Sequence, residues 1–343
     1  MTSTAGLDHG DRKPNYARRI KWLGIVTAVL MLAFTGGWLY LASVGETQID
    51  LALAKVNTGT QKIACDNRSI KGYPFRFGLF CNSVLVEQPA KGLRMSAGAL
   101  RTAAQVYNPW HLVAELDGPA SIDAPGLQPL EINWSLLHAS VRANRPLPDR
   151  ASIEANALDI SIRGQSEARS RAVIADYAAG HMRVENKDVA FAGEVDGLLV
   201  DPAITPNREI QSLSASYDAV LTDGVRILTS RPKTARQALR GASGEIRIAR
   251  IIFKDGGTLE LSGPLSIDAD GLVDGDVSIK FADGDKLGRA IAKMAPEAAS
   301  VIQPALSAAS LAAGKDKQAS LTLTIRKGKV SAGFFPIGNI PPI

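Results

Sequence analysis

The stretch TLELSGPLSIDADGLVDGDVSIKF, residues 258–281, decides the fold class. Apolar side chains take alternate positions on both sides of a central turn, at Leu259, Leu261, Leu265 and Ile267 before it and at Val273, Val277, Ile279 and Phe281 after it. A period of two is typical of a strand with one apolar and one polar face. Two such strands joined by a short turn that contains Gly indicate a hairpin. Residues 258–281 therefore predict an antiparallel hairpin with one apolar face.

The same alternation recurs along most of the chain. It predicts strands within residues 95–116, 132–141, 189–195, 212–221, 244–248 and 319–334. Within the first of these segments we expect two strands bent at Asn108-Pro109. The change of phase between Trp134 and Leu137 is typical of a bulge. The fold class that follows is mainly β, with one or more long, curved antiparallel sheets that have one apolar face.

Such a sheet must cover its apolar face by folding over itself, by packing a helix on it or by holding lipid. Residues 285–313 carry apolar side chains at three- and four-residue steps, which predicts a helical segment near the C-terminus that Pro296 and Pro304 should kink or split. A short helix is expected at residues 234–239, and residues 168–179 fit either a helix or a long strand. The tail FFPIGNIPPI is too apolar to be free, so we expect it to dock on the sheet.

An uncharged apolar run, WLGIVTAVLMLAFTGGWLYLA, occupies residues 22–42. A helix needs about 20 apolar residues to cross a bilayer. A signal peptide would have a shorter apolar core of about 7–15 residues, although Ala42 and Ser43 would permit cleavage. The run therefore favours one N-terminal transmembrane helix that anchors the chain in the inner membrane.

Charge around this run predicts the topology. Basic residues gather before it, at Arg12, Lys13, Arg18, Arg19 and Lys21, whereas Glu46 and Asp50 follow it. The positive-inside rule then places residues 1–21 in the cytoplasm as a basic tail and residues 43–343 in the periplasm as a β-rich domain. This tail explains most of the formal net charge of +5, so we expect no nucleic-acid partner.

The chain has two cysteines, Cys65 and Cys81. Between them the turn-like Gly72-Tyr73-Pro74 could let the flanking arms fold back. An oxidising compartment favours pairing, and closing a loop of about 15 residues stabilises by roughly 3 kcal/mol in the chain-entropy model. A metal site would need more Cys or His nearby, and no CxxC is present for redox exchange. We therefore predict a Cys65–Cys81 disulfide.

Four motifs resemble one protein family: GYPFRF at residues 72–77, AQVYNPWH at 104–111, the pattern of LSG, DG and DG between 261 and 275, and the closing PIG and IPP. They are similar to those of the DUF2125 proteins of alphaproteobacteria, across most of residues 20–343. The family has no established activity, so the resemblance implies fold and location rather than mechanism. GYPF after an anchor also resembles AsmA-like envelope proteins, which implies long sheets with an apolar groove and roles in lipid traffic.

Catalytic and metal motifs are absent from the sequence, so we expect no catalytic residue, metal ligand or cofactor. His111, Glu115 and Asp117 could form an acid–base cluster, but in a strand they share one face and fit a solvated surface better. Ser243, in Gly-Ala-Ser-Gly, does not complete a nucleophile elbow. Four aspartates only loosely resemble a calcium loop, and turn chemistry explains them at least as well: Asp268, Asp270, Asp274 and Asp276.

Two aromatic segments are the candidate partner or membrane contacts. The first is Tyr73-Pro74-Phe75-Arg76, followed by Phe77; alternation predicts that both Phe side chains fill the core while Arg76 points outward. The second is Asn108-Pro109-Trp110, whose Trp could cap the sheet or face lipid.

Three functions fit this sequence. The first is a non-enzymatic, membrane-anchored periplasmic protein that binds lipid or another apolar envelope component. The second is a structural or scaffolding envelope protein whose apolar face is simply its core. The third is a hydrolase of envelope polymers with His111 and Glu115 in its site. An open apolar face would favour the first, a closed core the second, and a cleft that gathers the two polar side chains the third.

Overall fold

The computed structural model describes residues 16–59, 61–164, 169–230, 234–296, 303, 306 and 318–343. The chain divides into an N-terminal unit, Met1–Leu51, and a compact unit, Ala52–Ile343. In the described part of the chain, 20 strands join in one antiparallel sheet. The expected mainly β class is confirmed.

Helix α1 spans Tyr16–Asn57 and contains the whole apolar run predicted at residues 22–42. It is long and apolar enough to cross a membrane, with a mean hydropathy of 1.9 in its most apolar stretch. The expected N-terminal apolar helix is thus present, and it continues well beyond Ala42.

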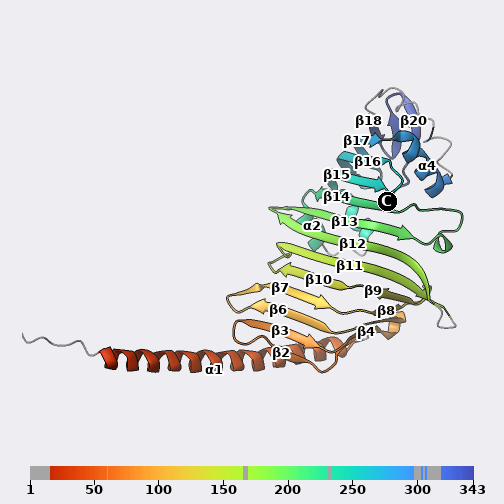
Figure 1. The fold of residues 1–343 in the computed structure, drawn as a ribbon. Coiled ribbons are helices and arrows are strands. Elements are labelled where there is room, and N and C mark those ends of the chain that lie inside the picture. Colours follow the sequence, from red (N-terminus) through yellow and green to blue (C-terminus); the bar gives the residue numbers. More distant parts are fainter. Residues whose placement is uncertain are drawn as a thin grey trace, which may run out of the picture. The chain divides into compact units, whose positions relative to one another are not determined.

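The sheet begins as two arms. The first arm contains β2 (Ser69–Lys71), β3 (Arg76–Cys81), β6 (Leu100–Gln105), β7 (Asn108–Leu116) and β10 (Leu136–Arg142). The second arm contains β1 (Lys62–Cys65), β4 (Val84–Gln88), β5 (Leu93–Ala97), β8 (Ala120–Asp123) and β9 (Leu130–Asn133). The chain passes back and forth between them, so neither arm is continuous in sequence. Figure 1 shows β3, β6 and β7 in one arm and β4, β8 and β9 in the other.

Strand β11 (Arg150–Arg163) joins the two arms. Its first half pairs with β10 and its second half with β9. Between the halves Ala157 has a φ of 50°, a left-handed conformation that interrupts the strand. This division corrects the expected bulge near Trp134: residues 132–141 do not form one kinked strand but two strands, β9 and β10, that belong to different arms.

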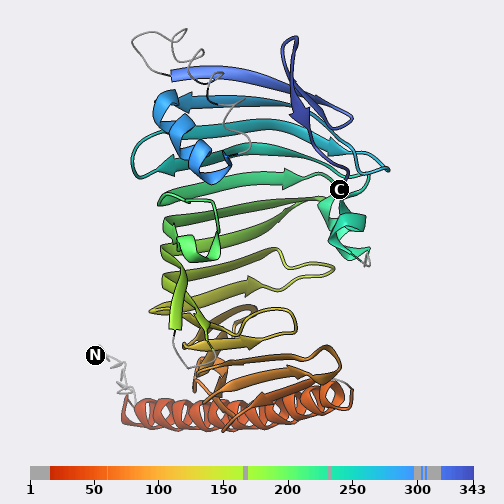
Figure 2. The ribbon, with the colours of Figure 1, turned by 90° about the vertical axis from the view of Figure 1, so that its right-hand side faces the viewer.

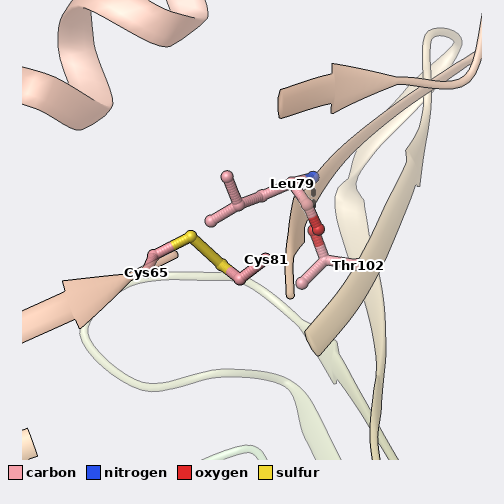
Figure 3. Close-up of a disulfide and its surroundings, with 4 residues drawn as sticks. All are labelled: Cys65, Leu79, Cys81 and Thr102. Carbon is pink, nitrogen blue, oxygen red and sulfur yellow. Dashed lines mark hydrogen bonds between the residues drawn. A yellow bond between two sulfur atoms is a disulfide. The ribbon is translucent and has the colours of Figure 1, made fainter. Parts of the chain in front are cut away.

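The predicted disulfide is confirmed and links the arms a second time. Cys65 of β1 bonds to Cys81 of β3, with their Cα atoms 5.2 Å apart (Figure 3). Cys81 is buried. Beside it the backbone N–H of Leu79 donates to Thr102 Oγ1 at 2.7 Å, which ties β3 to β6. The arms are therefore joined at β11 and at this disulfide.

After β11 the sheet is a simple meander, as Figure 2 shows. Its strands are β12 (Arg169–Glu185), β13 (Asp188–Val200), β14 (Leu213–Leu221), β15 (Ser243–Phe253), β16 (Thr258–Ile267), β17 (Val273–Ala282), β18 (Gln318–Arg326), β19 (Lys329–Ala332) and β20 (Phe335–Asn339). The hairpin predicted at residues 258–281 is β16 with β17. Residues 169–179 belong to strand β12, not to a helix.

Short helices and the chain end cover one face of this meander. Helices α2 (Gly224–Thr229), α3 (Ala235–Leu239) and α4 (Gly284–Met294) lie between strands in the sequence. Leu287 and Ala290 of α4 are fully buried against Phe253 and Phe281 of the sheet. The tail docks as expected only at its end, where Ile340 and Ile343 pack on a second core cluster around Val277, whereas Phe334 and Phe335 are exposed.

Two expectations about local structure need correction. The helical segment was expected near the C-terminus, but α4 ends at Met294 and three strands follow it. Pro296 comes directly after its end, while Pro304 and most of residues 297–313 lie outside the described residues. The bend expected at Asn108-Pro109 is instead a hairpin turn at Val106 and Tyr107, because Asn108 already pairs with Gln105.

Candidate functional site

We call the compact unit Ala52–Ile343 the β unit. One face of its sheet is apolar from β6 to β18. Residues that are direct cross-strand partners point to the same face. One such ladder runs from β6 to β18 through Thr102, Ala114, Ala139, Ile153, Gly180, Gly193, Tyr217, Ala249, Leu261, Ile279 and Leu321. The alternation seen in the sequence is therefore in register over eleven strands. We name this surface the apolar face.

The residues that the structure describes cover only part of the apolar face. In β13–β18 large side chains are buried on it, among them Val189, Leu213 and Phe281. In the described part of β1–β12 no Val, Leu, Ile, Met, Phe, Tyr or Trp is buried. Leu112 remains 42% exposed and Ile153 52%. We call the part formed by β7, β10, β11 and β12 the open segment.

Two facing glycines lie at the end of the open segment. Gly180 and Gly193 are direct partners in β12 and β13, and Ile153 and Tyr217 flank them in the ladder. A Cβ added to Gly193 would lie 2.6 Å from Tyr217 Cε1, so the ring lies over this glycine. Tyr217 is still 47% exposed. Between the exposed side chains of Ile153 and Tyr217, the surface of the sheet is therefore formed by the backbone of the two glycines.

The second aromatic candidate lies at one end of the open segment. Trp110 alternates with Leu112 on β7 and is 68% exposed. With Asn108, Arg142 and Arg145 it lines a hollow of about 840 Å³. Trp110 thus does not cap the sheet; it contributes an exposed ring beside arginine side chains.

The first aromatic candidate is placed differently from the prediction. Tyr73 and Pro74 form a turn closed by a hydrogen bond from Arg76 N–H to Gly72 O, at 2.9 Å. Phe77 is partly buried, but Phe75 is 63% exposed. The expectation that both Phe side chains fill the core is wrong for Phe75, because it lies in the turn before β3 begins and the alternation has not yet started. Arg76 is exposed, as expected.

Charged groups lie on the opposite, polar face. Arg101 of β6 makes a bidentate pair with Asp117, at 2.7 and 2.5 Å, and contacts Glu115 at 3.4 Å. The hydrogen bonds from this guanidinium hold the pKa of Asp117 below its usual value. Arg326 likewise holds the pKa of Asp276, on the polar face of β17, below its usual value.

The acid–base cluster considered from the sequence is not assembled. Glu115 and Asp117 line a hollow of about 260 Å³ with Arg101, but His111 is not among its lining residues. His111 instead stands opposite Arg142 in the register of β7 and β10. A carboxylate paired with an arginine is held ionised, which makes it a poor proton donor.

Three of the four carboxylates in the calcium-like segment, those of Asp268, Asp274 and Asp276, have structural partners. Asp268 Oδ1 accepts hydrogen bonds from the backbone N–H of Asp270 and Leu272, which closes the turn after β16. Asp274 Oδ1 accepts from Lys327 N–H at 3.0 Å. Within the described residues no three His, Cys, Asp or Glu side chains gather as a metal site. Ser243 is the first residue of β15.

Sequence reasoning missed the cross-strand neighbours of the open segment. The alternation predicted a strand around Leu112 but no strand at residues 150–163, which contain Ile153, and it did not predict that both side chains would remain exposed. A row of arginines on the polar face, Arg142, Arg150 and Arg183, was also missed, because it exists only through strand register.

The described fold and site define a class of protein: an antiparallel sheet after an apolar helix, with an apolar face that the described residues cover only in part. The chain belongs to the family of uncharacterised proteins conserved in bacteria that is named DUF2125, whose model matches residues 38–341. No curated protein matches the sequence.

Proposed function

We propose that this protein is anchored in the inner membrane by α1 and binds lipid acyl chains along the open segment. The basic residues before the apolar run support a topology with the N-terminus in the cytoplasm and the β unit in the periplasm. The disulfide fits that oxidising compartment. The resemblance to AsmA-like proteins stays a prediction and agrees with this function.

The observation that carries the proposal is the contrast in burial along one continuous face. A folded chain gains about 1.5–3 kcal/mol from fully burying a Leu or Ile side chain. The chain realises this gain on β14–β18 and leaves it unrealised at Leu112 and Ile153. Exposed contiguous apolar surface marks an interaction site.

An acyl chain fits the dimensions and the chemistry of the open segment. Strands lie about 4.8 Å apart, so its four strands span roughly 14 Å between their axes. Each methylene removed from water contributes about 0.8 kcal/mol. No ion pair interrupts the ladder, since its members between β7 and β12 are Ala114, Ala139, Ile153 and Gly180.

A matched pair of substitutions on β7 tests the proposal. Leu112 lies on the apolar face and its neighbour Val113 on the polar face, and both are 42% exposed. The full chain is purified in a neutral detergent and its bound lipid is quantified by mass spectrometry. We expect Leu112→Glu to lower the lipid bound per chain at least fivefold and Val113→Glu to leave it near wild type. Lipid held around α1 should be the same in the wild-type protein and in both variants, so a difference between them reports on the sheet.

Equal lipid content in the two variants, or a wild-type chain that carries no lipid beyond that of a detergent-solubilised α1 alone, would contradict the proposal and favour the scaffolding function. A photoreactive residue gives a second readout. Placed at Ile153 it should cross-link to acyl chains in cells, whereas at Val113 it should not.

A further inference from the structure

The polar face carries a row of cations that strand pairing alone brings together. Arg142 of β10 is the direct partner of Arg150 of β11, and Arg150 is the direct partner of Arg183 of β12. Direct cross-strand partners have Cβ atoms about 5 Å apart, and like charges at such positions destabilise a sheet. The register therefore concentrates positive charge at one end of three neighbouring strands.

A hollow of about 320 Å³ lies beside this row. Its lining includes Arg150, Ser152, His181, Arg183, Asp218 and Arg247. The small side chains of Ala190 and Ala192 also line it, which explains why there is space. His181 Nδ1 and Ser152 Oγ lie 2.9 Å apart in a hydrogen bond. The hollow thus combines guanidinium groups with a hydroxyl and an imidazole.

Two carboxylates fix part of the cluster without neutralising it. Glu185 accepts hydrogen bonds from Arg183 and, at 2.9 Å, from Arg247 Nη2. Arg247 Nη1 also lies 3.4 Å from Asp218 Oδ1. Within the described residues Arg150 has no acidic partner, and the same holds for Arg142. Three arginines, Arg150, Arg183 and Arg247, line the hollow and exceed the two carboxylates, Glu185 and Asp218, by one charge.

We propose that this hollow binds a phosphate group. Guanidinium groups present forked N–H donors that match the oxygens of a phosphate, and the excess of positive charge matches its negative charge. Glu185 holds Arg183 and Arg247 in place, and Arg150 lies beside Arg183 as its direct cross-strand partner. Ser152 adds a hydroxyl to the lining.

The site lies at the rim of the open segment. The residues next to the arginines in each strand, Val141, Ala151 and Met182, point to the apolar face and are themselves cross-strand partners. A phosphate bound in the hollow could therefore belong to a lipid whose acyl chain crosses the rim, or it could be free phosphate. The hollow stands on its own residues and does not depend on the acyl-chain site.

The test uses the full chain, delipidated in a neutral detergent. Inorganic phosphate and a short-chain phosphatidic acid are titrated separately by calorimetry and then in competition. Among the arginines that line the hollow, Arg150→Gln removes the one without an acidic partner in the described residues, and removing one of three neighbouring like charges should not impair folding. Arg250→Gln is the control, because Arg250 lies on the same polar face and pairs with Glu260 at 2.8 Å.

We expect saturable binding that weakens at least tenfold in Arg150→Gln and is unchanged in Arg250→Gln. Binding of both probes in competition assigns the site to the phosphate group from either source, binding of phosphatidic acid alone assigns it to a lipid headgroup, and binding of phosphate alone assigns it to the free ion. Absence of binding by both probes, or equal weakening in the two variants, overturns the proposal. Neither Arg150 nor Arg250 lies on the apolar face. If Leu112→Glu loses its bound lipid but still binds phosphate, the phosphate site is separate from the acyl-chain site.

Discussion

The two halves of the β unit share one sheet and one face pattern, yet they treat that face differently. In the half formed by β13–β20, α2, α4 and the chain end bury it, with Leu287 fully inaccessible. In the half formed by β1–β12, the apolar alternation is as regular but remains in part exposed to solvent. The comparison teaches that alternation alone specifies a one-sided sheet, while separate segments of the chain decide where that side becomes a core.

The largest expected effect is on the covered half. Leu287→Ala removes a fully buried side chain of α4, and we expect the free energy of unfolding to fall by about 2–5 kcal/mol. Ile153→Ala, on the open half, should change it by only about 0.5 kcal/mol, because Ile153 is already 52% exposed. Urea denaturation of the full chain in neutral detergent measures both. Similar losses would mean that the open segment is as tightly packed as the covered one.

The disulfide tests whether the two arms depend on one covalent link. Replacing both Cys65 and Cys81 by Ser should destabilise the arms by roughly 3 kcal/mol, because the bond closes a loop of 16 residues. Hydrogen exchange followed by mass spectrometry should show faster exchange in β1–β6 and unchanged exchange in β14–β18. Faster exchange in β14–β18 as well would indicate that the halves unfold together.

Two Gly→Ala substitutions sharpen the same contrast. A Cβ at Gly224 of α2 would lie 2.9 Å from Val189 Cβ, so Gly224→Ala should cost about 1–3 kcal/mol through overpacking. A Cβ at Gly180 would lie 3.6 Å from Ile153 Cγ2, an ordinary contact, so Gly180→Ala should be neutral or slightly stabilising. Thermal unfolding of both variants distinguishes them. Destabilisation by Gly180→Ala would show that the open segment has no room above its backbone.

The smallest effect concerns pH. Asp117, Glu185 and Asp276 each have a pKa held below the usual value by a neighbouring arginine. Their contribution to stability is present above the ordinary carboxyl pKa of about 4 and is lost as the pH falls through the lowered values. Because these groups are solvent-exposed, we expect Asp117→Asn to reduce stability at pH 7 by less than about 1 kcal/mol. It should reduce stability less at pH 3, and an equal loss at both values would contradict the ion-pair explanation.

The sequence predicted what local chemistry controls. Alternation located the hairpin at residues 258–281, the apolar composition of the tail predicted that its end docks, and the spacing of Cys65 and Cys81 around a turn predicted their bond. It could not predict that β9 and β10 separate into two arms, because that choice depends on which distant strand each one pairs with. The Arg150 cluster was hidden for the same reason. The exposure of Phe75 was not predicted either, because Phe75 lies in a turn and the apolar pattern does not show where that turn ends and β3 begins.

The division of β11 has a consequence for the order in which the protein forms. Both arms are made from residues that precede β11 in the chain, and among the described strands β11 is the one that pairs with both. During synthesis, residues 62–142 must therefore wait for residues 150–163 before their two sets of hairpins can be held in one sheet. The Cys65–Cys81 bond involves only early residues, so it can restrain the waiting chain before its joining strand has been made.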